Sequence, residues 1–313
     1  MKTPQVDIVG VGLNATDTII YLADFPAPGS KVAFLAARVL PGGQVATALL
    51  ACQSWGLRTR YVGKLGDDRA AKIHLEQFAA SGVEAQVTAV PECVSAQSFI
   101  LVDPQGERTV LWRRDQRLEL HAADLKREWI VNARVLHVDG SDTAAATAAA
   151  NWARSAGIPT VADLDEVYPG LDALLERIDY LIVSRDFPSR LLDEKDLQKS
   201  LPLLQRRFGS TVTAATLGSG GVLAWDGDKF HSVCAYRVPV VDTTGAGDIF
   251  HAGFIYGLLQ GWPLQRQLEF ACAAAALNCM APGARGGIRS ITEIEDLMTD
   301  GPRYPAAFDT PER

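Results

Sequence analysis

The sequence predicts an α/β protein with a mostly parallel sheet and helices on both faces of that sheet. Short apolar runs typical of buried strands recur along the chain, and alanine-rich or amphipathic stretches of helical pattern separate them. The strand-like runs are 6–12, 59–66, 133–140, 158–165, 178–184 and 211–218, and clear helical stretches are 45–55 and 143–156. Ligands of such a sheet bind at the carboxyl ends of its strands.

Two stretches break this alternation. Residues 20–40 are irregular and contain Pro26, Pro28 and Gly29, while "AQSFILVDPQGERTVLW" (96–112) has two strand-like runs around the turn residues 103–106. We expect both stretches to form a small β-strand lid from segments of about 15–41 and 95–114. The lid would be inserted in a single domain that spans 1–313.

Composition excludes several classes of protein. The formal net charge of -7 over 313 residues argues against a nucleic-acid binder, which usually carries a basic surplus. The five cysteines are scattered, without a Cys-x-x-Cys pair, as in proteins with free thiols in a reducing compartment. The first residues lack the apolar core of a signal peptide, and the apolar run 271–277 is too short to span a membrane. We therefore expect a cytoplasmic protein with no nucleic-acid or membrane partner.

The stretch "VDTTGAGDIFHAGF" (241–254) carries the strongest chemical signal. Gly245, Ala246 and Gly247 are typical of a turn that opens a helix, and the free N–H groups there favour a phosphate or another anion. Asp248 follows in the first helical turn, where a second negative charge would weaken phosphate binding. A general base that accepts a proton from an attacking hydroxyl explains the carboxylate better. We expect the helix N-terminus to keep Asp248 ionised and therefore weakly basic.

Simpler interpretations compete with this one. On its own, Asp248 in such a pattern is more often a helix cap than a base. The chain has no Gly-x-Ser-x-Gly elbow of a hydrolase, and the Gly10-x-Gly12 pair lacks the third glycine and the later acid of a dinucleotide-binding turn. Neighbouring motifs decide in favour of the base.

Four motifs, in the same order, resemble the ribokinase-like, PfkB-type carbohydrate kinases. They are "PGGQVATALLACQSWG" (41–56), "VGKLGDD" (62–68), "TLGSGG" (216–221) and "DTTGAGD" (242–248). The resemblance covers residues 6 to about 297. It implies a three-layer α/β/α sandwich with a β lid. It also implies transfer of the γ-phosphate of ATP to a sugar or nucleoside hydroxyl, with Mg2+.

The resemblance also implies roles for individual residues. Asp248 would be the catalytic base, and Gly245, Ala246 and Gly247 would form the anion hole. The acceptor site would contain Asp17, Gly42, Gly43, Gln44 and Thr47, to which we add His137 because it lies near the end of a predicted strand. The nucleotide site would contain Ser184, Thr216, Gly218, Gly220, Asn278 and Gly283. Asp163 and Asp165 are candidate Mg2+ ligands, and Asp242, Thr244 and Gly283 would surround a monovalent cation such as K+.

Departures from the family pattern bear on the substrate. Gln44 stands where members commonly have asparagine, and Ser184 and Phe187 replace the asparagine and glutamate of an Asn-x-x-Glu motif. The sequence there resembles the ketohexokinase and sulfofructose kinase branch, which gives a weak preference for a ketose such as fructose.

A nucleoside kinase of the same fold and a catalytically silent sugar- or nucleotide-binding protein are the alternatives. An exposed lid edge favours a homodimer.

Overall fold

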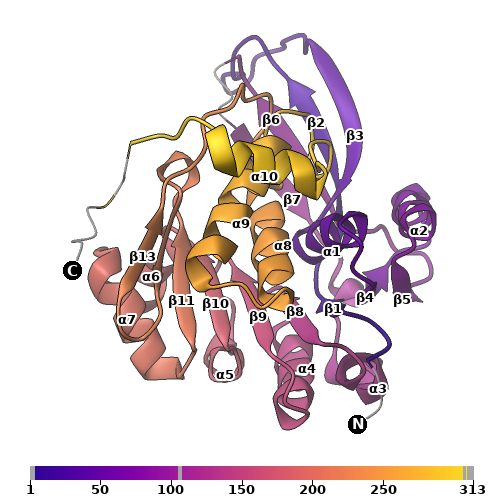
Figure 1. Cartoon of the computed structure of the whole chain (residues 1–313). Coiled ribbons are helices and arrows are strands. Elements are labelled where there is room, and N and C mark those ends of the chain that lie inside the picture. Colours follow the sequence, from indigo (N-terminus) through magenta and orange to yellow (C-terminus); the bar gives the residue numbers. More distant parts are fainter. Residues whose placement is uncertain (1–3, 105–107, 306–307, 309–313) are drawn as a thin grey trace.

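A nine-stranded sheet forms the centre of the computed structural model, which describes residues 4–104, 108–305 and 308 (Figure 1). The strand order is β13-β12-β11-β10-β9-β8-β1-β4-β5. The strands from β5 to β11 in that order are parallel, and β12 and β13 are antiparallel additions at one edge. The strands are β1 (Ile8–Val11), β4 (Thr59–Leu65), β5 (Glu84–Ala89), β8 (Val135–Asp139), β9 (Thr160–Leu164), β10 (Tyr180–Ser184), β11 (Val212–Thr216), β12 (Val222–Trp225) and β13 (Phe230–Val233).

Helices cover both faces of this sheet, and two separate apolar cores lie between the layers. The helices packed into one core are α1 (Gln44–Ser54), α8 (Ala246–Leu259) and α9 (Leu264–Asn278), with α2 (Arg69–Ser81) and α10 (Ile291–Asp300) beside them. The other core holds α3 (Arg127–Val131), α4 (Thr143–Ser155), α5 (Leu171–Leu175), α6 (Phe187–Leu192) and α7 (Leu197–Phe208). Short 3-10 turns span Gln116–Leu118, Ala122–Asp124 and Gly218–Gly220. The predicted three-layer sandwich is confirmed.

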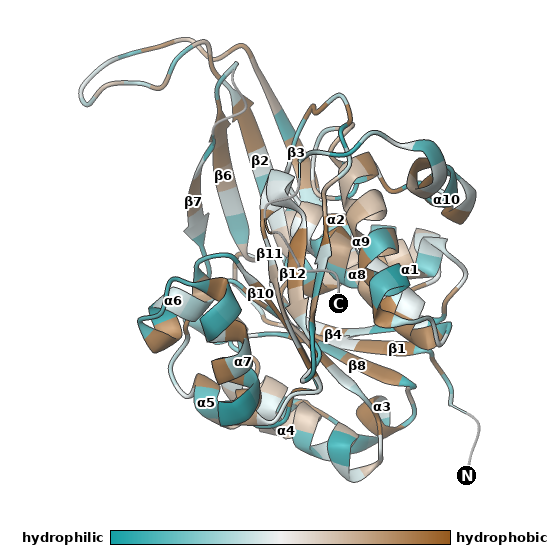
Figure 2. Cartoon of the chain, turned by 60° about the vertical axis from the view of Figure 1, so that its left-hand side comes forward, coloured by the Kyte–Doolittle hydropathy of each residue, from teal (hydrophilic) through white to brown (hydrophobic). Residues whose placement is uncertain are grey.

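A second sheet stands off the main body as the predicted lid. Its strands, in the order β3-β2-β6-β7, are β3 (Ala36–Gly42), β2 (Ala15–Tyr21), β6 (Gln97–Val102) and β7 (Arg108–Arg113). The strands and the loop that joins β2 to β3 project from the body, and apolar residues recur along the strands (Figure 2). Residues 105 and 106 of the predicted hairpin turn lie outside the described residues, but the antiparallel pairing of β6 with β7 confirms the hairpin strands.

The strand order around β1 determines where the site lies. From β1 the chain passes through the lid to β4 and β5 on one side, and it later returns to β8 on the other side. A crevice at the carboxyl ends of the strands opens at such a switch point, and ligands of α/β sheets bind there. Asp139, the last residue of β8, lies at this point.

One strand is shorter than the sequence indicates. The run from 230 to 242 looks strand-like, but β13 ends at Val233, and residues 234–245 continue without a ladder apart from a bridge between Tyr236 and Arg303. Within the described part of the chain, no helix is long and apolar enough to cross a membrane.

Candidate active site

The N-terminus of α8 presents free backbone amides at the carboxyl edge of the sheet. Gly245, the residue before the helix, has a φ of 75°, and a β-carbon on it would lie 2.5 Å from the α-carbon of Ala284. The N–H of Ala246 bonds to the carbonyl of Thr243, whereas the N–H groups of Gly247 and Asp248 have no backbone acceptor among the described hydrogen bonds. Space beside Gly247 is open. Two free amides at a helix N-terminus, next to open space, suit a phosphoryl group.

Asp248 lies in the first turn of α8, beside these amides. Burial, followed by the charge of Asp163, raises the pKa of Asp248 to about 7, although His251 and Arg285 oppose the shift. The expectation of a strongly ionised, weak base is therefore wrong, because burial among other carboxylates outweighs the helix N-terminus. A carboxylate with a pKa near 7 is a suitable general base at neutral pH.

Asp17 faces the crevice from the lid strand β2. Its carboxylate accepts a hydrogen bond from the hydroxyl of Ser98 on β6, the residue paired with it across the lid sheet. Burial raises the pKa of Asp17, and its charge in turn raises the pKa of Asp248. The predicted acceptor-binding acid and the predicted base therefore lie close enough to interact.

The glycine pair before α1 is required by packing. A β-carbon on Gly42 would lie 2.1 Å from a carboxylate oxygen of Asp17, and one on Gly43 would lie 2.3 Å from the α-carbon of Asn14. Both clashes are with protein atoms. The structure thus gives these glycines a first role in bringing α1 against the segment after β1, before any contact with a ligand.

Gln44 and Thr47 lie on the first turn of α1, and their side chains contact other protein groups. The Gln44 amide lowers the pKa of Asp163 and of Asp165, so it lies beside those carboxylates. The hydroxyl of Thr47 is buried and accepts a hydrogen bond from Nε of Arg285 at 3.1 Å. The start of α1 thus contacts charged groups from two other segments, Asp163 and Asp165 through Gln44 and Arg285 through the fully buried Thr47.

Arg285 is a site residue to which the sequence motifs give no role. Its guanidinium also donates to the side chain of Gln77 on α2 and to the carbonyl of Gly42. Burial lowers the pKa of Arg285 to about 10, while Asp248 and Asp17 act in the opposite direction. The only sequence signal is its place in the glycine-rich loop 281–287. That loop packs on Gly245 through Ala284, so Arg285 connects the start of α8 with Gly42 and Thr47 at the start of α1.

The prediction that His137 binds substrate is wrong. His137 is fully buried inside β8, two residues before the strand end, and its ring stacks on that of His251 with centroids 5.8 Å apart. Burial lowers the pKa of His137 to about 3. Its side chain therefore belongs to the interior between the sheet and α8.

Two further buried polar residues, Asn14 and Asp139, lie near the carboxyl ends of β1 and β8. The Asn14 amide nitrogen contacts the hydroxyl of Tyr61, and its oxygen is buried without a hydrogen-bond partner among the described atoms. Asp139 accepts hydrogen bonds from the N–H of Leu13 and from Ser141, and burial raises its pKa to about 6. Asn14 was within reach of sequence reasoning, since it opens the "NATD" segment that contains Asp17.

Arg114 is committed to a protein partner. Its guanidinium donates to Asp142 at 2.6 Å and to the carbonyl of Leu118 at 2.7 Å. Because Arg114 directly follows β7, this ion pair fastens the end of the lid to the main body.

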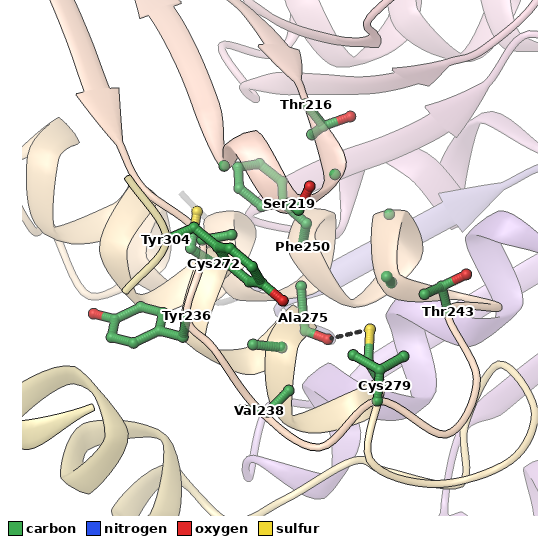
Figure 3. A pocket seen from close by; sticks show the side chains of 17 residues that line it. Thr216, Ser219, Tyr236, Val238, Thr243, Phe250, Cys272, Ala275, Cys279 and Tyr304 are labelled. Atoms are coloured by element: carbon green, nitrogen blue, oxygen red, sulfur yellow. Dashed lines mark hydrogen bonds between the residues drawn. The ribbon is translucent and has the colours of Figure 1, made fainter. Parts of the chain in front are cut away.

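A pocket of about 230 Å³ adjoins the anion site on the side of β11 (Figure 3). Its lining includes Thr216 and Gly218, two of the residues that the family resemblance assigns to a nucleotide site, together with Ala246 and Gly247 of α8. Most of the remaining wall is apolar and comes from the segment after β13 and from α8 and α9. Those residues are Ala235, Tyr236, Val238, Val240, Phe250, Cys272, Ala275, Ala276 and Cys279.

Four other predicted nucleotide residues lie outside this lining: Ser184, Gly220, Asn278 and Gly283. Asn278 is fully buried; its amide donates to the carbonyls of Thr244 and Ala284, and its oxygen accepts from the N–H of Gly287. Its donors are thus used to hold the loop 281–287. The hydroxyl of Ser184 approaches the carbonyl of Asp165 at 3.4 Å.

The predicted cation ligands fall into two groups. Asp242 accepts from the N–H of Thr244 at 2.9 Å and from that of Gly283 at 2.8 Å, and the Thr244 hydroxyl is buried without a partner in the described structure.

Asp163 lies at the end of β9, where one of its oxygens lacks a hydrogen bond and is 3.3 Å from Nδ1 of His251. Burial, then the charge of Asp165, raises the pKa of Asp163 well above its usual range. The raised pKa favours the neutral carboxyl, and a hydrated Mg2+ nearby would favour the ionised form that accepts hydrogen bonds from its water ligands. Among the residues described, no three or more His, Cys, Asp or Glu side chains gather as a metal site of their own.

Residues 6–291 match the model of the pfkB family carbohydrate kinases. The chain belongs to the pfkB family. It is an ATP-dependent kinase that transfers a phosphoryl group to an alcohol group of a sugar or nucleoside. This assignment removes the silent binding protein as an alternative.

Individual pfkB relatives differ in their acceptors. The chain is 24% identical to "Ribokinase" of Bacillus subtilis, over 94% of this chain and 99% of that protein. It is 28% identical to "Nucleoside kinase" of Methanothermobacter thermautotrophicus, over 94% of this chain and 96% of that protein. A solved structure of "a putative ribokinase from Agrobacterium tumefaciens" superposes with a TM-score of 0.87 at 29% identity, over 94% of this chain and 97% of that one. These relatives agree on the fold and the class of reaction, and they leave the acceptor open.

Proposed function

We propose that this pfkB kinase phosphorylates a hydroxyl of a small sugar, with Asp248 as the general base. The arrangement of three groups supports this most directly: Asp248 lies in the first turn of α8, between the pocket beside β11 and the lid carboxylate of Asp17. The donor nucleotide would occupy the pocket, and the acceptor would lie between Asp248 and the lid.

The reaction follows from these positions. The acceptor oxygen attacks the γ-phosphorus and loses its proton to the Asp248 carboxylate, as the bond from that phosphorus to the bridging oxygen of ATP breaks and ADP leaves. The free amides of Gly247 and Asp248 would stabilise charge on the transferring group. Asp17, with Asn14 beside the same crevice, would bind and orient acceptor hydroxyls.

Two cation sites are part of the proposal. Mg2+ would come with ATP and neutralise phosphate charge, while Asp163 and Asp165 would hold its water ligands. The unpartnered hydroxyl of Thr244 beside the loop held by Asp242 supports a monovalent cation such as K+. Activity in K+ at least several-fold above that in tetramethylammonium would support this second site.

The identity of the acceptor is tested by ADP release with Mg-ATP. The panel should contain ketoses, aldoses, sugar acids, sugar phosphates and nucleosides, and Asp248→Asn should be assayed beside the wild type. One strong substrate whose turnover the variant abolishes would establish both the acceptor and the base. The ketose preference, and with it the ketohexokinase and sulfofructose kinase branch, gains no support from the relatives and remains a prediction.

A nucleoside acceptor is the second candidate. Trp112 on β7 pairs with Ser98, so its side chain is on the lid face that carries Asp17, and it is 76% exposed. An exposed aromatic side chain on that face would stack on a nucleobase. Turnover of nucleosides, and not of free sugars, would favour this candidate.

We also infer a single kinase domain over 1–313, a cytoplasmic location and a homodimer formed through the lid. Val39, Phe99 and Leu111 form one row across the lid on the face opposite Asp17, and each is more than 40% exposed. Because the row is apolar and the lid has free edges, a second copy is the partner that it fits best. Sedimentation of wild type and Phe99→Asp tests this: a dimer that the substitution dissociates is expected, and a wild-type monomer would reject it.

A further inference from the structure

The C-terminal segment after α10 forms part of the nucleotide pocket. Residues 302–304 run beside 235–237, where the N–H of Arg237 donates to the carbonyl of Pro302 at 2.8 Å and the N–H of Tyr304 donates to that of Ala235 at 2.9 Å. Arg303 and Tyr236 form the bridge between these hydrogen bonds. The segment is therefore held by backbone pairing to the stretch that leads from β13 to the pocket.

Arg303 strengthens this attachment. Its guanidinium lies over the ring of Tyr236, 4.2 Å from the ring centroid, and donates to the Tyr236 hydroxyl. Tyr236 is itself buried and lines the pocket. Residues 302–304 are thus fixed against one wall of the cavity.

Tyr304 presents its side chain to the cavity from this segment (Figure 3). The ring is half-buried, and the Arg237 guanidinium lies 5.5 Å from its centroid. Arg237 does not line the pocket. The phenol ring therefore stands between an exposed cation and the cavity, and its hydroxyl has no hydrogen-bond partner among the described residues.

The two ends of the pocket differ in chemistry. Gly247 and Thr243 border it near the anion site, where phosphates would bind. Val238, Cys272 and Ala276 form an apolar wall elsewhere in the cavity. Among the lining residues, Tyr236 and Tyr304 are the largest side chains that end in a polar group. A flat, weakly polar group such as a nucleobase suits a wall of this kind.

We propose that Tyr304 is a binding residue for the nucleobase of the phosphate donor, with its ring as one wall of the base site and its hydroxyl facing the edge of the base. The inference rests on the proposed placement of ATP in this pocket. It adds a residue from the C-terminal segment, which none of the sequence motifs includes. It also predicts that the donor site is complete only when that segment is paired with 235–237.

The test measures binding of MgADP by calorimetry to the full chain, which requires no knowledge of the acceptor. Tyr304→Ala should raise the Kd about 5- to 100-fold, the range expected for loss of one base–aromatic contact. Tyr304→Phe should keep most of the affinity, and it should change the ratio of the Kd values for ADP and GDP if the hydroxyl reads the base edge. Arg237→Met is the matched control, because it alters the solvent side of the same ring and leaves the pocket lining intact.

The outcomes are distinguishable. If the wild type binds MgADP and Tyr304→Ala binds it equally well, Tyr304 has no role in base binding and the inference is wrong. If the wild type binds no nucleotide, the proposed function fails together with the inference. A purely structural role would lower the melting temperature of apo Tyr304→Ala without reducing the rise in melting temperature caused by MgADP. If that rise shrinks in Tyr304→Ala and not in Arg237→Met, the proposal is supported even where the variant is less stable.

Discussion

A β-carbon on Gly43 would lie 2.3 Å from the α-carbon of Asn14. Gly43 also has a φ of 93°, a conformation that residues with a side chain rarely adopt. This contact sets the distance between the start of α1 and the segment after β1, and both elements belong to the proposed acceptor site. The crevice therefore depends on the absence of one side chain.

Gly43→Ala should destabilise the protein by about 2–5 kcal/mol, since it combines a steric clash with a strained backbone. Gly56→Ala is the matched control. Gly56 follows the same helix with a φ of 86°, and a β-carbon added there would have nothing within 4 Å of it. Only the backbone cost of about 1–2 kcal/mol is expected at Gly56. Urea denaturation of both variants measures the difference, and equal losses would contradict the packing role of Gly43.

Asp248→Asn should lower kcat by about 10²–10⁴-fold, the usual contribution of a positioned general base. Binding of MgADP should stay within a few-fold of the wild-type value, because the amides of the anion site are retained. In the wild type, kcat/KM should rise with pH through about 7 as Asp248 loses its proton. Near-normal turnover of the variant would reject the assignment.

The same raised pKa has a consequence for stability. The pKa of Asp248 is about 7 in the folded protein against an ordinary value of 3.8, so the folded state binds more protons between these values. The contribution of Asp248 to stability therefore falls as pH rises from about 4 to about 7. Asp248→Asn removes this cost. The free energy of unfolding of the variant minus that of the wild type should therefore increase by on the order of 1–2 kcal/mol from pH 5 to pH 8. Urea denaturation at both pH values checks this, with the exposed Asp228→Asn as a control that should show no such growth.

Arg285→Met should move the acid limb of kcat/KM to higher pH, because the guanidinium favours the ionised form of Asp248. It should also raise the acceptor KM, since the carbonyl of Gly42 and the hydroxyl of Thr47 lose their common donor. Thr47→Val removes one of these hydrogen bonds and keeps the charge, so its acid limb should not move. The same shift in both variants would show that Arg285 acts only through packing.

The fold was predictable because its signals are local. Buried parallel strands such as β8 and β10 appear in the sequence as short apolar runs. The glycine turn before α8 indicates the start of a helix independently of its tertiary contacts. The proposed roles of Asp248 and Asp17 came from the resemblance to the family, which for Asp248 agrees with the chemistry of its glycine-rich turn. Asp248 and Asp17 occupy fixed places in their motifs, and the fold brings them together.

The expectations that were wrong or missing depended on where a side chain points and how deeply it is buried. His137 is two residues from the end of β8, and a strand pattern alone does not say which residue is last. The basicity of Asp248 was misjudged because the carboxylates around it come from distant segments. Arg285 escaped notice for a similar reason: its partners on α1 and α2 lie more than 200 positions away in sequence.

The pairing of Tyr304 with Ala235 bears on how this kinase should be handled in the laboratory. Residues 302–304 and 235–237 share backbone hydrogen bonds beside the pocket, so an affinity tag or fusion partner joined shortly after Tyr304 would disturb this pairing. Residues 4–7 lead into the amino end of β1, whereas Asp139 lies at the carboxyl end of the neighbouring strand β8. Fusions are therefore better placed on the N-terminal side, and kinetic constants from proteins with a C-terminal tag should be compared with those of tag-free enzyme.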